Sequence, residues 1–408
     1  GTRMSGADIV VQVLADEGVD TIFGYSGGAI LPTYDAVFRY NDRHRREDGS
    51  AAMPLIVPAN EQGAGFMASG YARASGKVGV VMVTSGPGAT NTVTPVRDCM
   101  ADSVPIVVIC GQVPRPAIGT DAFQEAPVAA IMGAVAKHVL LVTEPGKLEA
   151  TVRSAFELAR TGRPGPVVID IPKDVQNWEG EFKGEGALPL PGFRRRWQAI
   201  SDNRLSDLAC EKFYAMLAKS KRPLIYAGGG VINGNASKPM RRFASAYGIP
   251  VTTTLMALGA SDTTHPLALH MLGMHGLASA NYAVEDCDFL IAVGARFDDR
   301  VAGDPEHFAP KAKNIAHFDV DIAEVGKVKR VDWHHIGVLA RDLDDLLAYG
   351  RRIEFTKSFD KWHEEISELK REYCLAYDRE NELIQPYAVI EELNKHAKGE
   401  AIISTGVG

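Results

Sequence analysis

Short runs of apolar residues alternate with longer amphipathic stretches along the whole chain. The short runs are rich in Val and Ile and lack strict alternation with polar residues, which is typical of strands buried on both faces of a parallel sheet. In the first half of the chain we predict such strands at 55–57, 79–84, 105–110, 139–143 and 167–171. In the second half the corresponding runs lie at 223–227, 250–254, 289–293, 315–320 and 336–339.

The stretches between these runs have apolar residues at helical spacing. The clearest of them cover 7–17, 62–74, 148–159 and 206–217. Regular alternation of strand and helix predicts an α/β fold that consists of successive doubly wound parallel-sheet domains.

Two interruptions of this pattern divide the chain. Residues 178–200 are rich in Gly, Pro and Arg without periodicity, which is typical of a linker. Residues 349–382 are charged and helical, and we interpret them as a connector with solvated helices. The predicted domains are therefore 4–177, 201–348 and the beginning of a third one over 383–408. We expect that third domain to contain a helix up to His396 and a strand at 401–405, and to be truncated at Gly408.

Composition and charge exclude several classes of protein. Of the 408 residues, 46% are apolar and 23% are charged, which excludes a disordered chain, a collagen-like repeat and a coiled coil. No apolar run approaches the roughly 20 residues of a transmembrane helix, so we expect no membrane partner. The 51 acidic residues outnumber the 44 basic ones, and the net charge of −7 argues against nucleic acid as a partner. The five cysteines form no C-x-x-C pair, which favours a reducing cytoplasm, although a removed organellar transit peptide would leave no trace.

Glycine-rich turns and one acidic residue follow the predicted strands of the first domain. Glu61 comes shortly after strand 55–57, at the start of a helix, and glycine-rich turns lie at 23–29 and 84–91. Open α/β sheets bind ligands at the carboxyl ends of their strands, so the three segments together outline a pocket. Taken singly, Glu61 could equally cap its helix, and each turn could be an ordinary tight connection between strand and helix.

Three clusters follow predicted strands of the second domain in the same way. They are the glycines 228–230, the segment 296–300 with its arginines and aspartates, and Asp319. Glycines admit close approach of a ligand, arginines bind phosphates and a carboxylate binds ribose hydroxyls, so the set suits a dinucleotide. The absence of a G-x-G-x-x-G motif argues against an ordinary Rossmann site, and surface ion pairing is the alternative for the charged cluster.

With these segments in view, the chain resembles the catalytic subunit of acetohydroxyacid synthase (acetolactate synthase), a family that uses thiamine diphosphate and also binds FAD. The resemblance covers nearly the whole chain, and the strings IGTDAFQE and RFDDR within it are highly specific. It rests on FGYSGGAILPTYDA at 23–36, NEQGAGFMASGYARASGKVGV at 60–80, TSGPGATN at 84–91, DSVPIVVICGQVPRPAIGTDAFQEAP at 102–127, GRPGPVVIDIPKDVQ at 162–176, HMLGMHG at 270–276 and ARFDDRVAG at 295–303.

The resemblance implies a pyrimidine-binding domain, an FAD-binding central domain and the beginning of the domain that binds the diphosphate and Mg²⁺. It implies decarboxylative condensation of two pyruvates to 2-acetolactate, or of pyruvate with 2-oxobutanoate, in branched-chain amino-acid biosynthesis. The metal site is expected beyond Gly408, with no metal ligand in this chain, so the isolated fragment is expected to be inactive. Active sites in this family lie between two chains, so a homodimer or tetramer is expected, with a separate small regulatory subunit in anabolic members.

Residue by residue, the resemblance makes Glu61 the catalytic carboxylate, which contacts a ring nitrogen of the aminopyrimidine and promotes loss of the thiazolium proton. It implies a substrate pocket at Tyr25, Gly27, Phe123, Gln124 and Lys173. FAD is expected to be largely structural, because the net reaction is not a redox reaction. The resemblance implies that it is held by Arg163, Gly228, Gly229, Gly230, Thr254, Leu255, Met271, Leu272, Gly273, Met274, His275, Gly294, Arg296, Asp298, Arg300, Asp319 and Asp342.

Three positions depart from the family pattern, and two other readings stay open. Asn60 stands where His is usual, Ser26 where Pro is usual and Ala136 where Thr is usual, which bears on substrate preference and inhibitor sensitivity. One alternative is a flavin-redox relative such as pyruvate oxidase, and the other is a non-catalytic chain that binds FAD or a partner. Glu61 argues against glyoxylate carboligase-like relatives, which lack it, and RFDDR argues against catabolic acetolactate synthases, which lack FAD.

Overall fold

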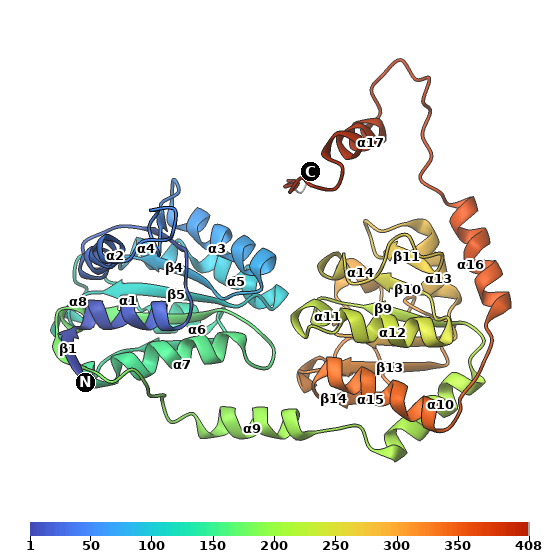
Figure 1. The fold of residues 1–408 in the computed structure, drawn as a ribbon, viewed down its shortest axis with the longest axis horizontal. Helices are drawn as coiled ribbons and strands as arrows, with labels where there is room; N and C mark the ends of the chain where they lie inside the picture. The colour runs from blue at the N-terminus through green and yellow to red at the C-terminus, as the bar shows by residue number, and fades with distance from the viewer. Residues whose placement is uncertain (407–408) are drawn as a thin grey trace.

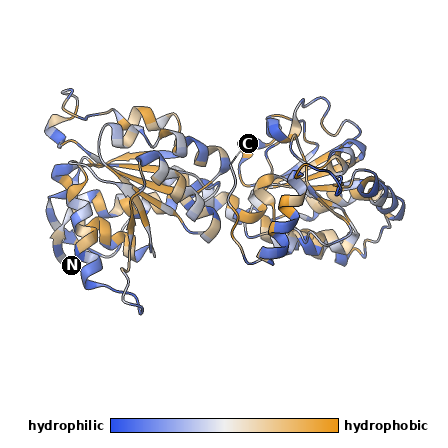
Figure 2. Cartoon of the chain, turned by 90° about the horizontal axis from the view of Figure 1, so that it is seen from above, coloured by the Kyte–Doolittle hydropathy of each residue, from blue (hydrophilic) through white to orange (hydrophobic). Residues whose placement is uncertain are grey.

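The computed structural model describes residues 1–406 and contains two parallel six-stranded sheets with helices packed against them (Figure 1). The predicted α/β fold class is confirmed. Apolar residues are concentrated in the two sheets and on the helix faces turned toward them, and polar residues lie outside (Figure 2). Each sheet therefore has its own hydrophobic core.

The first sheet has the strand order β3-β2-β4-β5-β7-β6, and all neighbours are parallel. Its strands are β2 (Ile22–Tyr25), β3 (Leu55–Ile56), β4 (Gly79–Val83), β5 (Ile106–Gln112), β6 (His138–Leu141) and β7 (Val167–Pro172). The helices of this domain are α1 (Gly6–Asp16), α2 (Leu31–Arg43), α3 (Glu61–Ser75), α4 (Pro87–Thr90), α5 (Val93–Asp102), α6 (Val128–Gly133), α7 (Leu148–Arg160) and α8 (Lys173–Gln176), with single 3-10 turns η1 (Arg115–Ala117) and η2 (Pro145–Lys147). Helices α1, α2 and α7 form an apolar layer on one face of the sheet, and α3, α5 and α6 form one on the other.

The second sheet has the order β11-β10-β9-β12-β13-β14 and is also entirely parallel. Its strands are β9 (Pro223–Ala227), β10 (Val251–Thr253), β11 (Ala268–Met271), β12 (Phe289–Val293), β13 (Asn314–Asp319) and β14 (Trp333–Ile336). The helices are α10 (Asp207–Lys219), α11 (Gly230–Asn233), α12 (Ser237–Tyr247), α13 (Ala278–Asp286), α14 (Asp299–Ala302), α15 (Leu339–Arg352) and α16 (Asp360–Glu372), with η3 (Leu255–Ala257) and η4 (Ile322–Glu324). The fully buried ring of Phe213 lies at the centre of an aromatic cluster and has the rings of Phe289 and Trp333 at 5.5 and 5.4 Å.

Both sheets contain a point at which the strand order reverses. In the first sheet it lies between β2 and β4, and in the second between β9 and β12. The connections that leave two neighbouring strands at such a point run in opposite directions, which opens a crevice at their carboxyl ends. Of the predicted turn 23–29, residues 23–25 belong to β2 and residues 26–29 follow it; the turn 84–91 follows β4, and the glycines 228–230 and Gly294 follow β9 and β12. The fold thus places two separate groups of glycines at the strand ends where the sequence pattern predicted ligands.

Two of the predicted strands differ in the structure, and two strands of the large sheets, β2 and β11, are not among the predicted ranges. The strand predicted at 336–339 is β14 at Trp333–Ile336, because Leu339 already begins α15; in β14 the side chains of Trp333 and His335 are buried and that of His334 is exposed, so no continuous apolar run marks it. The edge strand β11 was missed for a related reason, since only two of its four residues are buried. The strand predicted at 401–405 is absent: residues 401–406 pair with no other strand among the described residues.

The two predicted connectors contain more structure than their composition indicated. Within 178–200, β8 (Glu179–Phe182) pairs antiparallel with β1 (Thr2–Ser5) of the first domain. It is followed by α9 (Pro191–Asp202), which runs between the two domains (Figure 1). Within 349–382, Trp362 and Ile366 of α16 are buried in the core of the second domain. The helix predicted up to His396 is α17 (Pro386–Ala397), and none of its residues is buried.

Candidate functional site

Glu61 occupies the first turn of α3, close to the end of the edge strand β3. Asn60 caps the helix, and its Oδ1 accepts a hydrogen bond from the backbone N–H of Gly63 at 2.8 Å. The role of helix cap is thus filled by Asn60, which leaves the half-buried Glu61 side chain for another contact. Its Oε2 accepts a hydrogen bond of 2.9 Å from Nδ2 of Asn91, which lies just after α4. Two segments that are 30 residues apart in sequence therefore meet at this carboxylate.

The surface beside Glu61 is formed by the backbone of Gly27 and Gly88, and we call this surface the floor. A Cβ on Gly88 would lie 2.7 Å from Cγ2 of Thr84, and one on Gly27 would overlap the same methyl group. Thr84 joins the two turns, because its Oγ1 accepts a hydrogen bond of 3.2 Å from the N–H of Ala29. Behind the floor lies the buried ring of Tyr34, whose pKa is raised by burial and by the negative charge of Glu61.

The loop from 113 to 127 brings Gln124 to the glycine-rich turn after β4. Gly86 has a φ of +59°, and a Cβ there would lie 2.6 Å from the carbonyl oxygen of Gln124. Gln124 itself has a φ of +56°, a left-handed backbone conformation that costs a non-glycine residue free energy and is common at functional sites. Phe123 is 89% exposed. Lys173 follows β7, which β5 separates from β4, so it lies at the same edge of the sheet but further along.

Large apolar side chains near Glu61 are left open to solvent. Ile56 and Val57 precede it, and Phe66 and Met67 follow on α3. Together with Phe123 they are between 42% and 89% exposed. We call these five residues the apolar rim. Glu61 lines neither the cavity between the domains nor the smaller one beside Tyr71, and its hydrogen bond with Asn91 is exposed to solvent.

A cavity of about 570 Å³ lies at the carboxyl ends of β9 and β12, and residues of both domains line it. Its glycines have no room for side chains: a Cβ on Gly228 would overlap the carbonyl oxygen of Gly294, and one on Gly230 would lie 2.6 Å from Cα of Gly294. Backbone N–H groups close the turn, since that of Gly230 donates to the carbonyl of Gly294 at 2.9 Å. This close approach of two chain segments explains the glycines at these positions.

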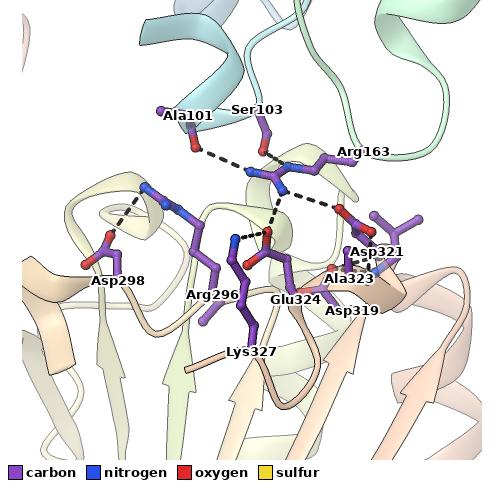
Figure 3. A network of polar contacts seen from close by, with 12 residues as sticks. Ala101, Ser103, Arg163, Arg296, Asp298, Asp319, Asp321, Ala323, Glu324 and Lys327 are labelled. Atoms are coloured by element: carbon purple, nitrogen blue, oxygen red, sulfur yellow. Dashed lines mark hydrogen bonds and ion pairs between the residues drawn. The ribbon is translucent and has the colours of Figure 1, made fainter. Parts of the chain in front are cut away.

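Arg163 joins the two domains at the edge of this cavity (Figure 3). Its Nε donates to Oγ of Ser103 at 2.9 Å within the first domain. Its Nη1 donates to Oε1 of Glu324 at 2.7 Å and to Oδ2 of Asp321 at 3.3 Å, both in the second domain. Glu324 also accepts a hydrogen bond from Lys327 at 3.2 Å. The guanidinium of Arg163 thus binds side chains of both domains.

The donors and the space in this cavity fit a flavin dinucleotide. Arg296 lies with Nη2 at 3.6 Å from Oδ2 of Asp298, a separation that leaves most of its N–H groups available to phosphate oxygens. The buried hydroxyl of Thr254 lines the cavity and has no hydrogen-bond partner within residues 1–406. A buried hydroxyl without a partner is costly, so Thr254 is a candidate ligand contact.

All but three of the residues predicted to hold FAD line this cavity. Gly273 and Met274 lie just outside it, where the N–H of Met274 donates to the carbonyl of Arg300 at 2.8 Å. Asp342 is buried behind the lining residue Gly337: its Oδ1 accepts hydrogen bonds from Arg341, and its Oδ2 lies 3.3 Å from Nε2 of His335. The role of all seventeen residues in FAD binding stays a prediction.

Several lining residues were not found by sequence reasoning. Ser103 and Glu324 contribute polar groups, and Trp197 of α9, Tyr226 of β9 and Asn233 of α11 add side chains to the wall. Ser103 has a φ of +58°, but Ser gives no sequence signal of a left-handed conformation. Trp197 lies in the segment interpreted as a linker. Contacts across a domain boundary carry no local pattern, which is why these residues were missed.

Two other kinds of feature are absent from the described residues. Among the described residues, no group of three or more His, Cys, Asp or Glu side chains is arranged to hold a metal ion. No helix in the described part of the chain is both long and apolar enough to cross a bilayer.

Substituting Gly228 by Ala is expected to destabilise the second domain. The added Cβ has no space against Gly294, and overpacking of this kind costs about 1–3 kcal/mol. The thermal midpoint should fall by about 2–4 °C for each kcal/mol, measured by circular dichroism. Gly70→Ala on the exposed face of α3 is the matched control, since its Cβ meets nothing within 4 Å. That change should leave the midpoint unchanged or raise it, and equal effects of the two substitutions would contradict the close packing of Gly228 against Gly294.

Comparison with known proteins agrees with this geometry. Residues 4–131 match the family described as "Thiamine pyrophosphate enzyme, N-terminal TPP binding domain", and residues 210–363 match "Thiamine pyrophosphate enzyme, central domain". The first match covers β2 to β5 of the first sheet with the glycine-rich turns after β2 and β4, and the second covers all six strands of the second sheet. The chain therefore belongs to the thiamine pyrophosphate enzymes.

Within this family the predicted resemblance to acetolactate synthases is confirmed by sequence similarity. The chain is 44% identical to the acetolactate synthase large subunit of Corynebacterium glutamicum, over 100% of this chain and 62% of the relative. It is 44% identical to acetolactate synthase 1, chloroplastic, of Zea mays over 99% of the chain and 61% of the relative. For acetolactate synthase, chloroplastic, of Arabidopsis thaliana the values are 42%, 99% and 58%. The chain spans about three fifths of the length of these relatives.

Proposed function

We propose that the full-length protein is an acetohydroxyacid synthase, which joins two pyruvates, or pyruvate and 2-oxobutanoate, with loss of carbon dioxide. The observation that carries this proposal is the position of Glu61. Its carboxylate lies at the reversal point of the first sheet, is oriented by Asn91 and faces a floor of glycine backbone. A planar heterocycle that must approach the backbone closely and exchange a proton with a carboxylate fits such a place.

Thiamine diphosphate, when bound, supplies the nucleophilic carbon of the reaction. Glu61 holds and moves a proton at Oε1, since Oε2 is engaged by Asn91. The missing side chain at Gly88 leaves room in front of this oxygen, because a Cβ there would lie 3.9 Å from it. Asn60, which stands where the family usually has His, is occupied as the cap of α3 and does not titrate near neutrality. Proton transfer in this site therefore depends on Glu61.

The predicted substrate residues would act from the side of the loop 113–127. Gln124 would bind the 2-oxo acid by its amide, and Phe123, which is exposed in the single chain, would become part of the pocket wall. Lys173 would attract the substrate carboxylate toward the same edge of the sheet, together with Tyr25 and Gly27 of the first turn. These roles rest on the resemblance and on the shared sheet edge.

A second copy of the chain would cover the open side of Glu61. The apolar rim supports this part of the proposal, because exposed apolar side chains around a functional carboxylate mark an interaction surface. Water would then be excluded from the carboxylate, which strengthens its interactions with a bound heterocycle.

We also propose a homodimer or tetramer, a separate small regulatory subunit and a cytoplasmic location.

FAD would occupy the cavity between the domains, held by the glycines 228–230, Arg163, Arg296 and Thr254. Its position supports a structural role, since Arg163 ties the two domains together at the cavity edge. Mg²⁺ and the diphosphate would be bound by residues outside this chain, as the resemblance implies.

The test of this function is a colorimetric acetoin assay on the complete gene product. Acetolactate should form from pyruvate only when thiamine diphosphate, Mg²⁺ and FAD are supplied together. Flavin that bleaches during turnover with pyruvate would instead favour a redox enzyme, and a protein that binds FAD without any turnover would favour a non-catalytic role.

A further inference from the structure

A buried carboxyl group in the first domain has no role in the site described so far. Asp170 lies in the middle of β7, and its register neighbours on the two flanking strands are Cys110 and Leu141. It is 2% exposed, its Oδ1 has no hydrogen-bond partner among residues 1–406, and burial raises its pKa to about 7. A buried polar side chain that costs free energy in this way calls for a compensating role.

The remaining oxygen of Asp170 connects to the loop that carries Gln124. Oδ2 accepts a hydrogen bond of 2.9 Å from Nε2 of Gln112, the last residue of β5. The same Nε2 donates to the carbonyl of Ala126 at 3.2 Å, and Oε1 of Gln112 accepts from the N–H of Val113 at 2.8 Å. Gln112 is 3% exposed. Both the nitrogen and the oxygen of this amide are therefore hydrogen-bonded. These bonds fix its orientation, with the N–H groups toward Asp170 and Ala126.

These contacts hold both ends of the loop 113–127. Val113 is its first residue, and Ala126 is next to its last. Inside the loop, the carboxylate of Glu125 accepts hydrogen bonds from the N–H groups of Gly119 and Ala122 at 2.5 and 3.1 Å, so the segment from 119 to 126 forms one unit. Gln124 belongs to this unit, and its carbonyl lies against Gly86.

We propose that Asp170 is a positioning residue, which acts through Gln112 to hold the loop 113–127, and with it Gln124, against the glycine-rich turn beside Glu61. Oδ2 can accept from Gln112 whether the carboxyl group is ionised or carries its proton on Oδ1, so the link persists across neutral pH. The carboxyl group itself is out of reach of any bound substrate. Its role for substrate binding rests on the function proposed above, whereas the anchoring of the loop does not.

Hydrogen–deuterium exchange on the 408-residue chain without ligand tests the anchoring. Asp170→Leu removes the acceptor at similar size and should speed exchange of amides 119–126 by about tenfold, because the Gln112 link is lost. Exchange in β4 and β9 should stay as in the wild type. Asp170→Asn keeps an acceptor oxygen and should restore slow exchange in the loop. Uniformly faster exchange, or no change at all, in a folded Asp170→Leu protein would overturn the proposal.

Gln112→Met covers the case in which Asp170→Leu fails to fold, since it breaks the same link from the other end and leaves the carboxyl group in place. It should speed hydrogen–deuterium exchange of the same amides 119–126, and unchanged exchange would also overturn the proposal. In the full-length protein, Asp170→Leu should raise KM for pyruvate by about fivefold or more with a smaller change in kcat, and Asp170→Asn should not. If the loop loosens but Glu61→Gln keeps full activity, the proposed function is wrong while the anchoring stands.

Discussion

Replacing Glu61 by Gln in the full-length protein is expected to slow acetolactate formation by about 10²–10⁴-fold, the contribution of a positioned acid–base group. The amide keeps the shape of the side chain and can still accept the hydrogen bond from Asn91, so the fold should be unaffected. What it loses is the ability to take up and release a proton. Turnover in the acetoin assay and the thermal midpoint would be measured together.

A glutamate of the second domain provides the control for this experiment. Glu285 is exposed on α13, and Glu285→Gln removes the same charge without touching the site. It should turn over like the wild type. If Glu61→Gln were as active as Glu285→Gln, Glu61 would have no part in the chemistry.

Arg296→Ala is expected to weaken the binding of FAD by about 10- to 100-fold, because a charge-assisted hydrogen bond to phosphate contributes about 1.5–3 kcal/mol. Arg296 lines the cavity between the domains. Its contact with Asp298 is weak, at 3.6 Å, and leaves the guanidinium N–H groups available to phosphate oxygens. The purified protein should lose its yellow colour on gel filtration, which the ratio of flavin to protein absorbance measures.

The matched change is Arg195→Ala, at an exposed arginine of α9. It should keep its flavin. An unchanged absorbance ratio in Arg296→Ala would mean that this cavity does not hold the flavin, and it would also remove the support for Arg296, Asp298 and Arg300 as ligands.

The cores of the two domains could be predicted because their strands are buried on both faces. Strands 223–227 and 289–293 have the predicted bounds, and Glu61 and the glycine-rich turns lie at the expected sheet edges. Edge strands such as β14 were shifted or missed, because one exposed face breaks the apolar run. Strand formation also needs a neighbour, so the apolar run at 401–405 did not suffice for a strand in the described part of the chain.

The residues of the candidate sites also fall into two groups, those that the sequence could identify and those that it could not. Residues at strand ends, such as Glu61 and Gly228, could be identified because sheet topology gathers them. Asn91, which orients Glu61, and Gln112, which connects the buried Asp170 to a loop, depend on side-chain contacts between distant segments. Ser103 and Glu324 reach the cavity only because two domains meet there. No local pattern encodes such contacts.

The most direct test of the central claim is the rate at which bound thiamine diphosphate exchanges its thiazolium proton for deuterium, measured by nuclear magnetic resonance after acid quenching. In the wild-type full-length protein this exchange should be at least about a hundredfold faster than in Glu61→Gln, since a positioned proton-transfer group contributes that much. Equal exchange rates in the two proteins, each saturated with the cofactor, would contradict the assignment of Glu61.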